Sequence, residues 1–192
     1  MNVFLALLAA YLVGSIPFGL IIGKLIWKKD LRQFGSRNIG ATNAWRVLGK
    51  KAGILVFILD FLKGQIGVLL GACLIGTSTA MVLGGFFAMV GHVFPLFAGF
   101  KGGKGVSTGL GVLSTLMPKI MAIVIIVWLV LVVLTRYVSV GSVVAAILTP
   151  ILAACFKLPA EFFAFSLAAA VVIVWRHKEN IARLRVGREN KF

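Results

Sequence analysis

Residues 120–135 read IMAIVIIVWLVLVVLT, sixteen consecutive positions without a charged side chain. A helix needs roughly 20 mostly apolar residues to cross the hydrocarbon core of a bilayer, so this run comes close to that length by itself. The strands of a membrane barrel would alternate apolar and polar residues, and this stretch does not. It therefore predicts a transmembrane helix in an all-α integral membrane protein.

The rest of the chain has the same character. Hydrophobic residues make up 60% of the 192 positions, charged residues 13%, and the mean hydropathy is +1.07. One soluble domain could not bury so much apolar surface, so the bilayer must cover part of it. We predict one membrane-embedded domain, 1–192, with seven transmembrane helices at 3–24, 53–72, 80–98, 105–118, 119–135, 140–156 and 160–176. The fourth is short: it would reach only about 21 Å.

The basic residues predict an orientation. If all seven helices cross, one face receives eight Lys and Arg from 24–51, two at 101 and 104, one at 136 and six from 176–191. The opposite face keeps only Lys119 and Lys157. By the positive-inside rule, the N-terminus is outside and the C-terminus is cytoplasmic. The net charge of +15 is thus explained at a membrane surface, and no nucleic-acid-binding motif accompanies it.

Polar chemistry is concentrated in three segments predicted to face the cytoplasm: 35–46, 101–108 and 177–184. Secondary transporters usually place their polar sites at broken helices near the bilayer midplane, within repeated halves. Polarity gathered at one face favours an interfacial active site. A small transporter or channel for phosphate-bearing solutes remains the alternative.

The second segment contains a glycine–lysine loop, KGGKG at 101–105, followed by the helix that carries Thr108. Glycines at 102, 103 and 105 allow backbone N–H groups to approach an anion, and Lys104 adds a full charge near a helix N-terminus. This predicts a phosphate site. It is not a Walker A loop, because Gly105 stands where Ser or Thr is required. A tight turn with a lysine that reaches the interface is the alternative.

The other two segments could serve the same chemistry. The first supplies hydroxyl and amide groups with an arginine that could grip phosphate: Ser36, Asn38, Thr42, Asn43 and Arg46. In the third segment, His177 and Asn180 share one face if the tail is helical. The alternatives are an N-capped interfacial helix and an ordinary interface histidine.

A few remaining residues have structural interpretations. Asp60 and Lys63 form an i, i+3 pair inside a predicted span, where an unpaired charge is costly. Cys73 and Cys155 lie in apolar helix ends and are expected to be buried, without a disulfide or metal. The five acidic residues are not clustered as ligands, so we expect neither metal nor cofactor.

Three stretches together, GSRNIGATNAWRVLG, GHVFPLFAGFKGGKGVSTG and HKENIARLRVGRENK, resemble the bacterial acyl-phosphate:glycerol-3-phosphate acyltransferase family. The resemblance covers essentially the whole chain. It implies transfer of a fatty acyl group from acyl phosphate to the 1-hydroxyl of sn-glycerol 3-phosphate. The products would be lysophosphatidic acid and inorganic phosphate, in the first acylation of bacterial phospholipid synthesis. It also implies an enzyme of the cytoplasmic (inner) membrane with its active site on the cytoplasmic face, surrounded by membrane lipids and needing no protein partner.

The resemblance also indicates which positions of this chain match the family's motifs. The family's motifs fall on Ser36, Asn38, Gly40, Thr42, Asn43 and Arg46, on His92, Pro95, Lys101, Gly102, Gly103, Lys104, Gly105 and Thr108, and on His177, Asn180 and Arg183, with serines at Ser139 and Ser142. Arg37 and Ser107 depart from the pattern, because many members have Gly and Ala there. The His-x4-Asp motif of soluble-type acyltransferases is absent, since Phe97 and Ala182 stand five residues after the two histidines.

The implied reaction does not require a strong base, because acyl phosphate is a mixed anhydride with a good leaving group. We expect Arg46, Lys104, His177, Asn180 and Ser142 to hold glycerol 3-phosphate. Thr42, Asn43 and the backbone of Gly102–Gly105 would hold the donor's phosphate. Ser36 and His177 are the candidate proton carriers, and a substrate phosphate is the alternative base.

Overall fold

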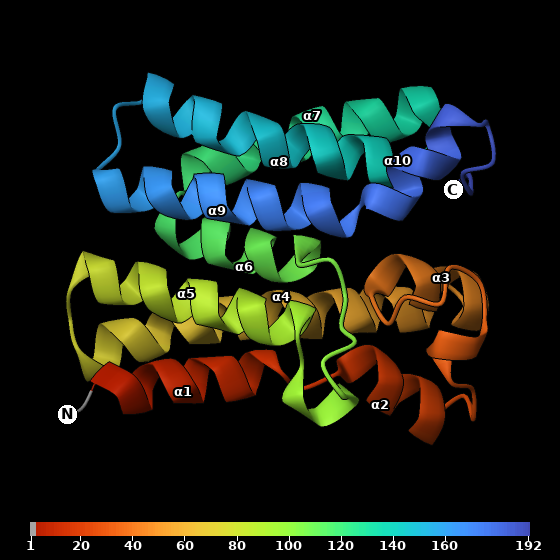
Figure 1. Ribbon diagram of the computed structural model, residues 1–192, viewed down its shortest axis with the longest axis horizontal. Coiled ribbons are helices and arrows are strands. Elements are labelled where there is room, and N and C mark those ends of the chain that lie inside the picture. The colour runs from red at the N-terminus through yellow and green to blue at the C-terminus, as the bar shows by residue number, and fades with distance from the viewer. Residues whose placement is uncertain (1–2) are drawn as a thin grey trace. The chain divides into compact units, whose positions relative to one another are not determined.

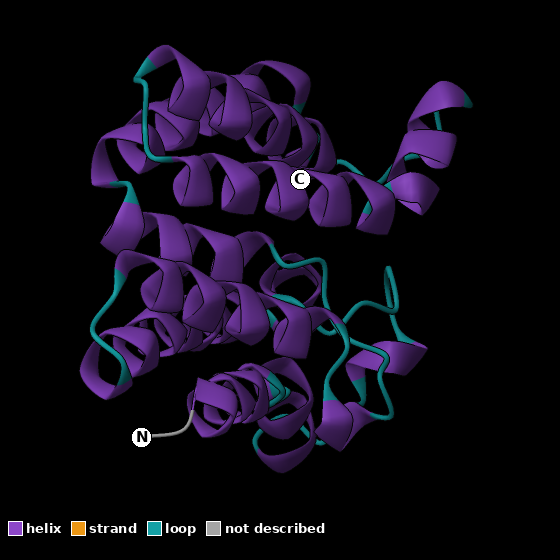
Figure 2. Cartoon of the chain, turned by 60° about the vertical axis from the view of Figure 1, so that its left-hand side comes forward, coloured by secondary structure: helices purple, strands orange, loops and turns teal. Residues whose placement is uncertain are grey.

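The computed structural model describes residues 3–192, and within them it contains helices and loops but no strand (Figures 1 and 2). The all-helical prediction is therefore confirmed. The chain forms two compact units, the first ending at Thr115 and the second comprising Leu116–Phe192. Each is described separately.

The helices of the first unit, red to green in Figure 1, surround a long central helix. They are α1 (Val3–Gly14), α2 (Phe18–Leu25), η1 (Leu31–Gln33), α3 (Ala41–Leu48), α4 (Lys50–Leu74), α5 (Ser78–Val93), η2 (Leu96–Ala98) and α6 (Val106–Leu116). α1 and α5 pack against α4 and against each other. The helices approach closely because small residues face one another, as Gly67 does with Gly84 and Ala88.

The predicted span 3–24 matches the apolar segment Val3–Leu25, which is broken into two helices, α1 and α2, at residues 15–17. The cause is Pro17, which lacks a backbone N–H and disfavours helical geometry at the residue before it. The break leaves the buried Ser15 and the carbonyl of Ile16 without a continuous helix around them. The break therefore places polar groups, the Ser15 hydroxyl and the Ile16 carbonyl, within an otherwise apolar span.

α6 begins directly after the glycine–lysine loop and packs against both α4 and α5. A side chain at Gly111 would overlap the backbone of Phe61, and Val112 contacts Gly85. At 11 residues α6 is about 16 Å long. This is shorter than the bilayer core, as the sequence predicted for the fourth helix.

The second unit consists of α7 (Pro118–Thr135), α8 (Val138–Cys155), α9 (Ala160–Arg176) and α10 (Lys178–Arg185). α8 packs against both α7 and α9. In α7 only Ile120 and Val124 are buried, and Val133 and Leu134 are each 75% exposed. Such an apolar, exposed helix needs lipid around it.

Five helices within residues 3–192 are long and apolar enough to span a membrane, counting α1 and α2 as one. A sixth is added if α9 and α10, bent by 54°, form one span. The chain is thus a multi-pass membrane protein. The seventh crossing would have to be α6, so seven crossings stay a prediction.

The expected burial of the two cysteines is wrong. Cys73 in α4 and Cys155 in α8 are both free and both exposed on the protein surface. In a membrane protein, lipid covers apolar side chains as well as protein does, so an apolar sequence context does not predict burial within the fold.

Candidate active site

Asn43, in the first turn of α3, shapes the loop that precedes it. Its Nδ2 donates to the carbonyls of Leu31 (3.2 Å), Phe34 (3.1 Å) and Asn38 (2.8 Å), and its Oδ1 accepts from the backbone N–H of Ser36 (2.9 Å). The side chain is buried. Direct phosphate contact by Asn43 stays a prediction, whereas its contacts here give it a role in fixing the loop.

The same loop makes two sharp turns. Gly35 and Arg37 have φ values of 59° and 58°, in the left-handed region that favours glycine. The resemblance leads us to expect glycine at 37, and this φ explains why. Asn38 Oδ1 accepts from the N–H of Gly40 (2.8 Å), which closes the loop before α3 begins. Ser36, Thr42 and Arg46 of the predicted site are half-buried on this loop and helix.

The glycine–lysine loop has no regular structure and leads into the N-terminus of α6. Gly105, with φ of 85°, turns the chain into the helix, whose first N–H groups have no partners within the helix. Lys104 is half-buried beside this end. Thr108, in the first turn, is fully buried, and its hydroxyl has no hydrogen-bond partner.

His92, at the end of α5, contacts the glycines of this loop. The backbone N–H of Gly103 donates to the carbonyl of His92 (3.1 Å), and a Cβ at Gly103 would overlap the His92 ring. A Cβ at Gly102 would overlap the same carbonyl. The amide of Gly103 is therefore engaged within the protein, unlike the prediction that it binds phosphate.

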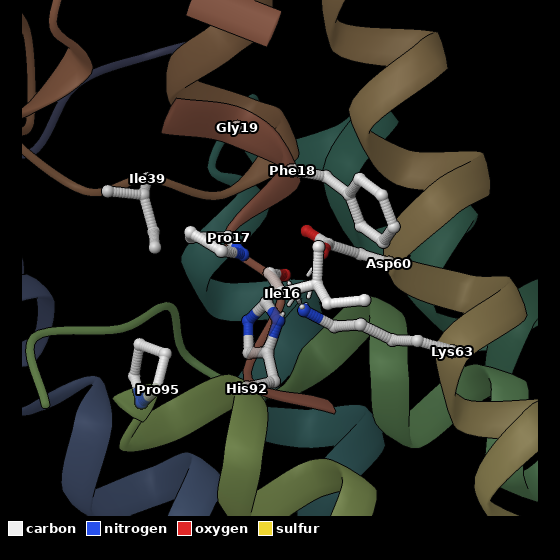
Figure 3. Close-up of a pocket in the computed structure, with 9 residues that line it drawn as sticks. All are labelled: Ile16, Pro17, Phe18, Gly19, Ile39, Asp60, Lys63, His92 and Pro95. Atoms are coloured by element: carbon white, nitrogen blue, oxygen red, sulfur yellow. Dashed lines mark hydrogen bonds and ion pairs between the residues drawn. The ribbon is translucent and has the colours of Figure 1, made fainter. Parts of the chain in front are cut away.

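Two motifs distant in sequence meet within the first unit. Ile39 of the first motif packs with Leu20 of α2 and Ala98 of η2 in a buried cluster. Close by, a pocket is lined by Ile16, Pro17, Phe18, Gly19, Ile39, Asp60, Lys63, His92 and Pro95 (Figure 3).

Three polar side chains converge in this pocket, two from α4 and one from α5 (Figure 3). Lys63 Nζ lies 2.9 Å from Asp60 Oδ1, which confirms the predicted pair, and donates to the carbonyl of Ile16 (3.1 Å). His92 Nδ1 lies 3.5 Å from the same Asp60 oxygen. The sequence analysis did not predict that His92 contacts this pair. The feature that could have indicated it is a histidine within an apolar run shortly before the glycine–lysine loop.

In the second unit, Glu189 gathers three donors: Ser139 Oγ (2.9 Å), Asn180 Nδ2 (2.5 Å) and Arg183 Nε (2.7 Å). Burial of Glu189 favours the neutral acid, but these hydrogen bonds outweigh burial and hold the pKa of the carboxyl below its ordinary value. Sequence reasoning missed Glu189. The signal was an acidic residue in an arginine-rich tail.

His177 lies at the bend between α9 and α10 and is buried. Its Nδ1 is 2.7 Å from the carbonyl of Ile173. Because a carbonyl only accepts, Nδ1 carries the hydrogen, and in the neutral ring Nε2 is the atom that accepts a proton. Ser142 donates to the carbonyl of Val138 (2.9 Å) and accepts from Trp128 Nε1 (3.3 Å).

The predicted site residues thus fall into two sets. The first unit contains the loop of Ser36, the helix of Arg46 and the glycine–lysine loop, and the second unit contains Ser142, His177 and Asn180. Among residues 3–192, no three His, Cys, Asp or Glu side chains group as metal ligands.

Fold and motifs define a multi-pass helical membrane protein whose polar loops are built around glycines, basic residues and buried amides. The chain belongs to the glycerol-3-phosphate acyltransferase family, whose model matches residues 4–187. It is 44% identical over 193 residues to a glycerol-3-phosphate acyltransferase of Listeria monocytogenes, covering 100% of this chain and 97% of that protein. One from Streptococcus thermophilus is 44% identical over 200 residues, covering 99% and 93%.

Solved structures agree with this assignment. The chain is similar to the crystal structure of PlsY (YgiH), an integral membrane glycerol 3-phosphate acyltransferase, in its glycerol 3-phosphate form. The TM-score is 0.95 at 42% identity, covering 100% of this chain and 96% of that one. The form of PlsY with lysophosphatidic acid gives a TM-score of 0.91 at 41% identity, with the same coverage.

Proposed function

We propose that this protein transfers a fatty acyl group from acyl phosphate to the 1-hydroxyl of sn-glycerol 3-phosphate. The observation that carries the proposal is the full-length similarity to PlsY, whose two structures are a glycerol 3-phosphate form and a lysophosphatidic acid form. Those two molecules are the acceptor and the product of such a reaction. The ester forms as the bond between the carbonyl carbon and the phosphate oxygen breaks, and inorganic phosphate leaves.

The chemistry demands positioning and charge stabilisation more than a strong base. Lys104 and the N–H groups at the start of α6, which have no partner within the helix, supply positive charge and donors at one place. Thr42 and the amides of Gly102 and Gly105 are the proposed contacts to the donor's phosphate. Gly103 instead anchors the loop to His92 through its N–H.

The acceptor requires cations and a proton carrier. As the resemblance implies, the proposed ligands of glycerol 3-phosphate are Arg46, Lys104, Ser142, His177 and Asn180. His177 is suited to proton transfer, because its Nδ1 is held by Ile173 and Nε2 is left as the basic atom. Ser36 and a substrate phosphate remain the other candidates for this proton. Asn38 and Asn43 hold the loop that presents Ser36.

We also propose the topology and location. The distribution of Lys and Arg supports seven crossings, an outside N-terminus and a cytoplasmic C-terminus, in a bacterial inner membrane with the active site on the cytoplasmic face. The whole chain acts as one acyltransferase domain within membrane lipids.

Donor selection tests the proposal. A coenzyme A thioester needs a surface for its nucleotide, whereas acyl phosphate needs only a compact phosphate site. Purified protein in lipid vesicles should acylate glycerol 3-phosphate from acyl phosphate, with little or no product from acyl-CoA, and EDTA should leave the rate unchanged. Comparable rates from acyl-CoA, or loss of activity with EDTA that Mg²⁺ or Zn²⁺ restores, would contradict the donor assignment.

A further inference from the structure

Three titratable side chains lie buried side by side in the first unit, and the proposed chemistry uses none of them. Asp60 and Lys63 are each 2% exposed and His92 is 5% exposed. They converge on one Asp60 oxygen, at 2.9 Å from Lys63 and 3.5 Å from His92 (Figure 3). We call Asp60, Lys63 and His92 the buried triad.

Charge neutralisation alone does not account for the triad. An ion pair buried in apolar surroundings costs desolvation that its attraction only partly offsets, and apolar residues of similar size are often as stable. Lys63 and Asp60 would already neutralise each other without His92. The other contacts of Lys63 and His92 therefore indicate what the triad does.

The first of these contacts is made by Lys63 with the segment 15–17, where the first span is broken between α1 and α2. Lys63 Nζ donates to the carbonyl of Ile16 (3.1 Å), next to Pro17, which has no N–H. The ammonium also lies 5.8 Å from the centre of the Phe18 ring. Lys63 thereby ties α4 to the junction of α1 and α2.

The other contact is the glycine–lysine loop. The ring of His92 occupies the space that a side chain at Gly103 would need, and its carbonyl accepts from the Gly103 N–H. Asp60 restrains the ring at Nδ1. If the ring turned or shifted, it would displace Gly103, and the neighbouring Lys104 would move with it.

We propose that the buried triad is a positioning device for the donor site. Asp60, itself held by Lys63, fixes His92, and His92 fixes Gly102 and Gly103, so that Lys104 and the start of α6 keep the geometry that receives the donor's phosphate. This inference rests on the proposed function for the identity of that phosphate. The triad touches no reacting atom.

The test compares variants at His92 in purified protein in lipid vesicles. His92→Asn keeps an N–H that can reach Asp60 in place of Nδ1, whereas His92→Leu keeps bulk without polarity. Asp60→Leu combined with Lys63→Met removes the anchor without leaving an unpaired charge. Gln65→Met is the matched control, because Gln65 on the same helix donates to Ser114 Oγ (3.0 Å) and does not contact the loop.

Two readouts are needed. The first is KM for acyl phosphate and for glycerol 3-phosphate separately. The second is the rate of trypsin cleavage after the exposed Lys101 relative to cleavage after Lys157, measured in detergent so that the protease reaches both faces. This ratio reports the order of the loop without any substrate.

His92→Leu and the double variant should raise KM for acyl phosphate roughly 10- to 100-fold, the scale of a small misplacement. They should raise KM for glycerol 3-phosphate by a clearly smaller factor, since Lys104 is the one proposed ligand of this substrate that lies on the displaced loop. Cleavage after Lys101 should accelerate, His92→Asn should recover most of both losses, and Gln65→Met should match the parent.

The proposal is overturned if His92→Leu leaves the donor KM and the Lys101 cleavage unchanged, or if His92→Asn fails as badly as His92→Leu. It is also overturned if cleavage after Lys157 rises in parallel, because that would mean general unfolding. Should the parent protein not use acyl phosphate at all, the proposed function fails, and the cleavage ratios still decide the positioning role.

Discussion

Glu189 shows how much one carboxylate can organise. It joins the N-terminal turn of α8, through Ser139, to two positions of α10, through Asn180 and Arg183. Asn180 is a predicted site residue, so the carboxylate holds a side chain of the predicted site in place. Hydrogen bonds to a charged partner contribute about 1.5–3 kcal/mol each, and a buried donor left unpaired is costly.

The stability of this cluster should depend on pH. The pKa of Glu189 is lower in the folded protein than in the unfolded chain, so the unfolded chain binds more protons between the two values. The stabilisation is complete at neutral pH and is lost as pH falls through the ordinary Glu range and below the folded pKa. Thermal unfolding in detergent should show a lower Tm toward acidic pH, and Glu189→Gln should have a lower Tm at pH 7 with a shallower pH dependence. If Tm fell equally steeply with pH in the parent and in Glu189→Gln, Glu189 would not stabilise the fold in this way.

Lys104 is the cation of the proposed donor site. Lys104→Ala should lower kcat/KM by roughly 10²–10³, as loss of one group that stabilises developing negative charge does. The unfolding temperature should stay near that of the parent, because Lys104 is only half-buried. Ser107→Ala is the matched control and should keep full activity. If Lys104→Ala kept a near-normal kcat/KM, the glycine–lysine loop would be a structural turn and not a phosphate site.

At the scale of the elements, the sequence predicted helices well where apolar runs are bounded by charge or proline. The predicted span 160–176 coincides with α9, and 119–135 differs from α7 by one residue. Contacts between residues distant in the sequence could not be predicted from apolar runs. Asn43 has the composition of a ligand-binding amide, but its partners are carbonyls up to 12 positions away that only the folded loop brings together. The contacts of His92 with Asp60 and Gly103 likewise depend on how α4 and α5 pack.

The loop before α3 gives a prediction of its own. Asn43→Asp keeps an acceptor for the N–H of Ser36 but replaces a donor to three carbonyls with a negative oxygen. The loop should open, with faster chymotrypsin cleavage after the exposed Phe34 and activity reduced at least tenfold, roughly the effect of misplacing a binding group. Arg37→Gly should leave both unchanged, because glycine suits the left-handed φ there. An intact loop in Asn43→Asp would contradict the organising role.

At the scale of the whole molecule, α6 determines the topology. It is too short to span the bilayer by length alone, yet counting it as a crossing places 17 of the 20 Lys and Arg on one face. Cysteines placed at 32, 50 and 188, in a background with Cys73 and Cys155 replaced by Ala, should react only with reagent on the cytoplasmic side. A cysteine at 157 should react from outside. External labelling at 188 would refute the seven-crossing topology.

The central claim is acyl transfer to glycerol 3-phosphate, and product analysis tests it most directly. Purified protein in sealed lipid vesicles receives acyl phosphate and labelled glycerol 3-phosphate, and lipid and aqueous phases are separated and identified by mass spectrometry. Our account predicts labelled 1-acyl-glycerol 3-phosphate with one inorganic phosphate released per ester formed, and formation of both slowed roughly 10²–10³-fold in Lys104→Ala. Label that only accumulates inside the vesicles as unchanged glycerol 3-phosphate would contradict the account and identify a transporter instead.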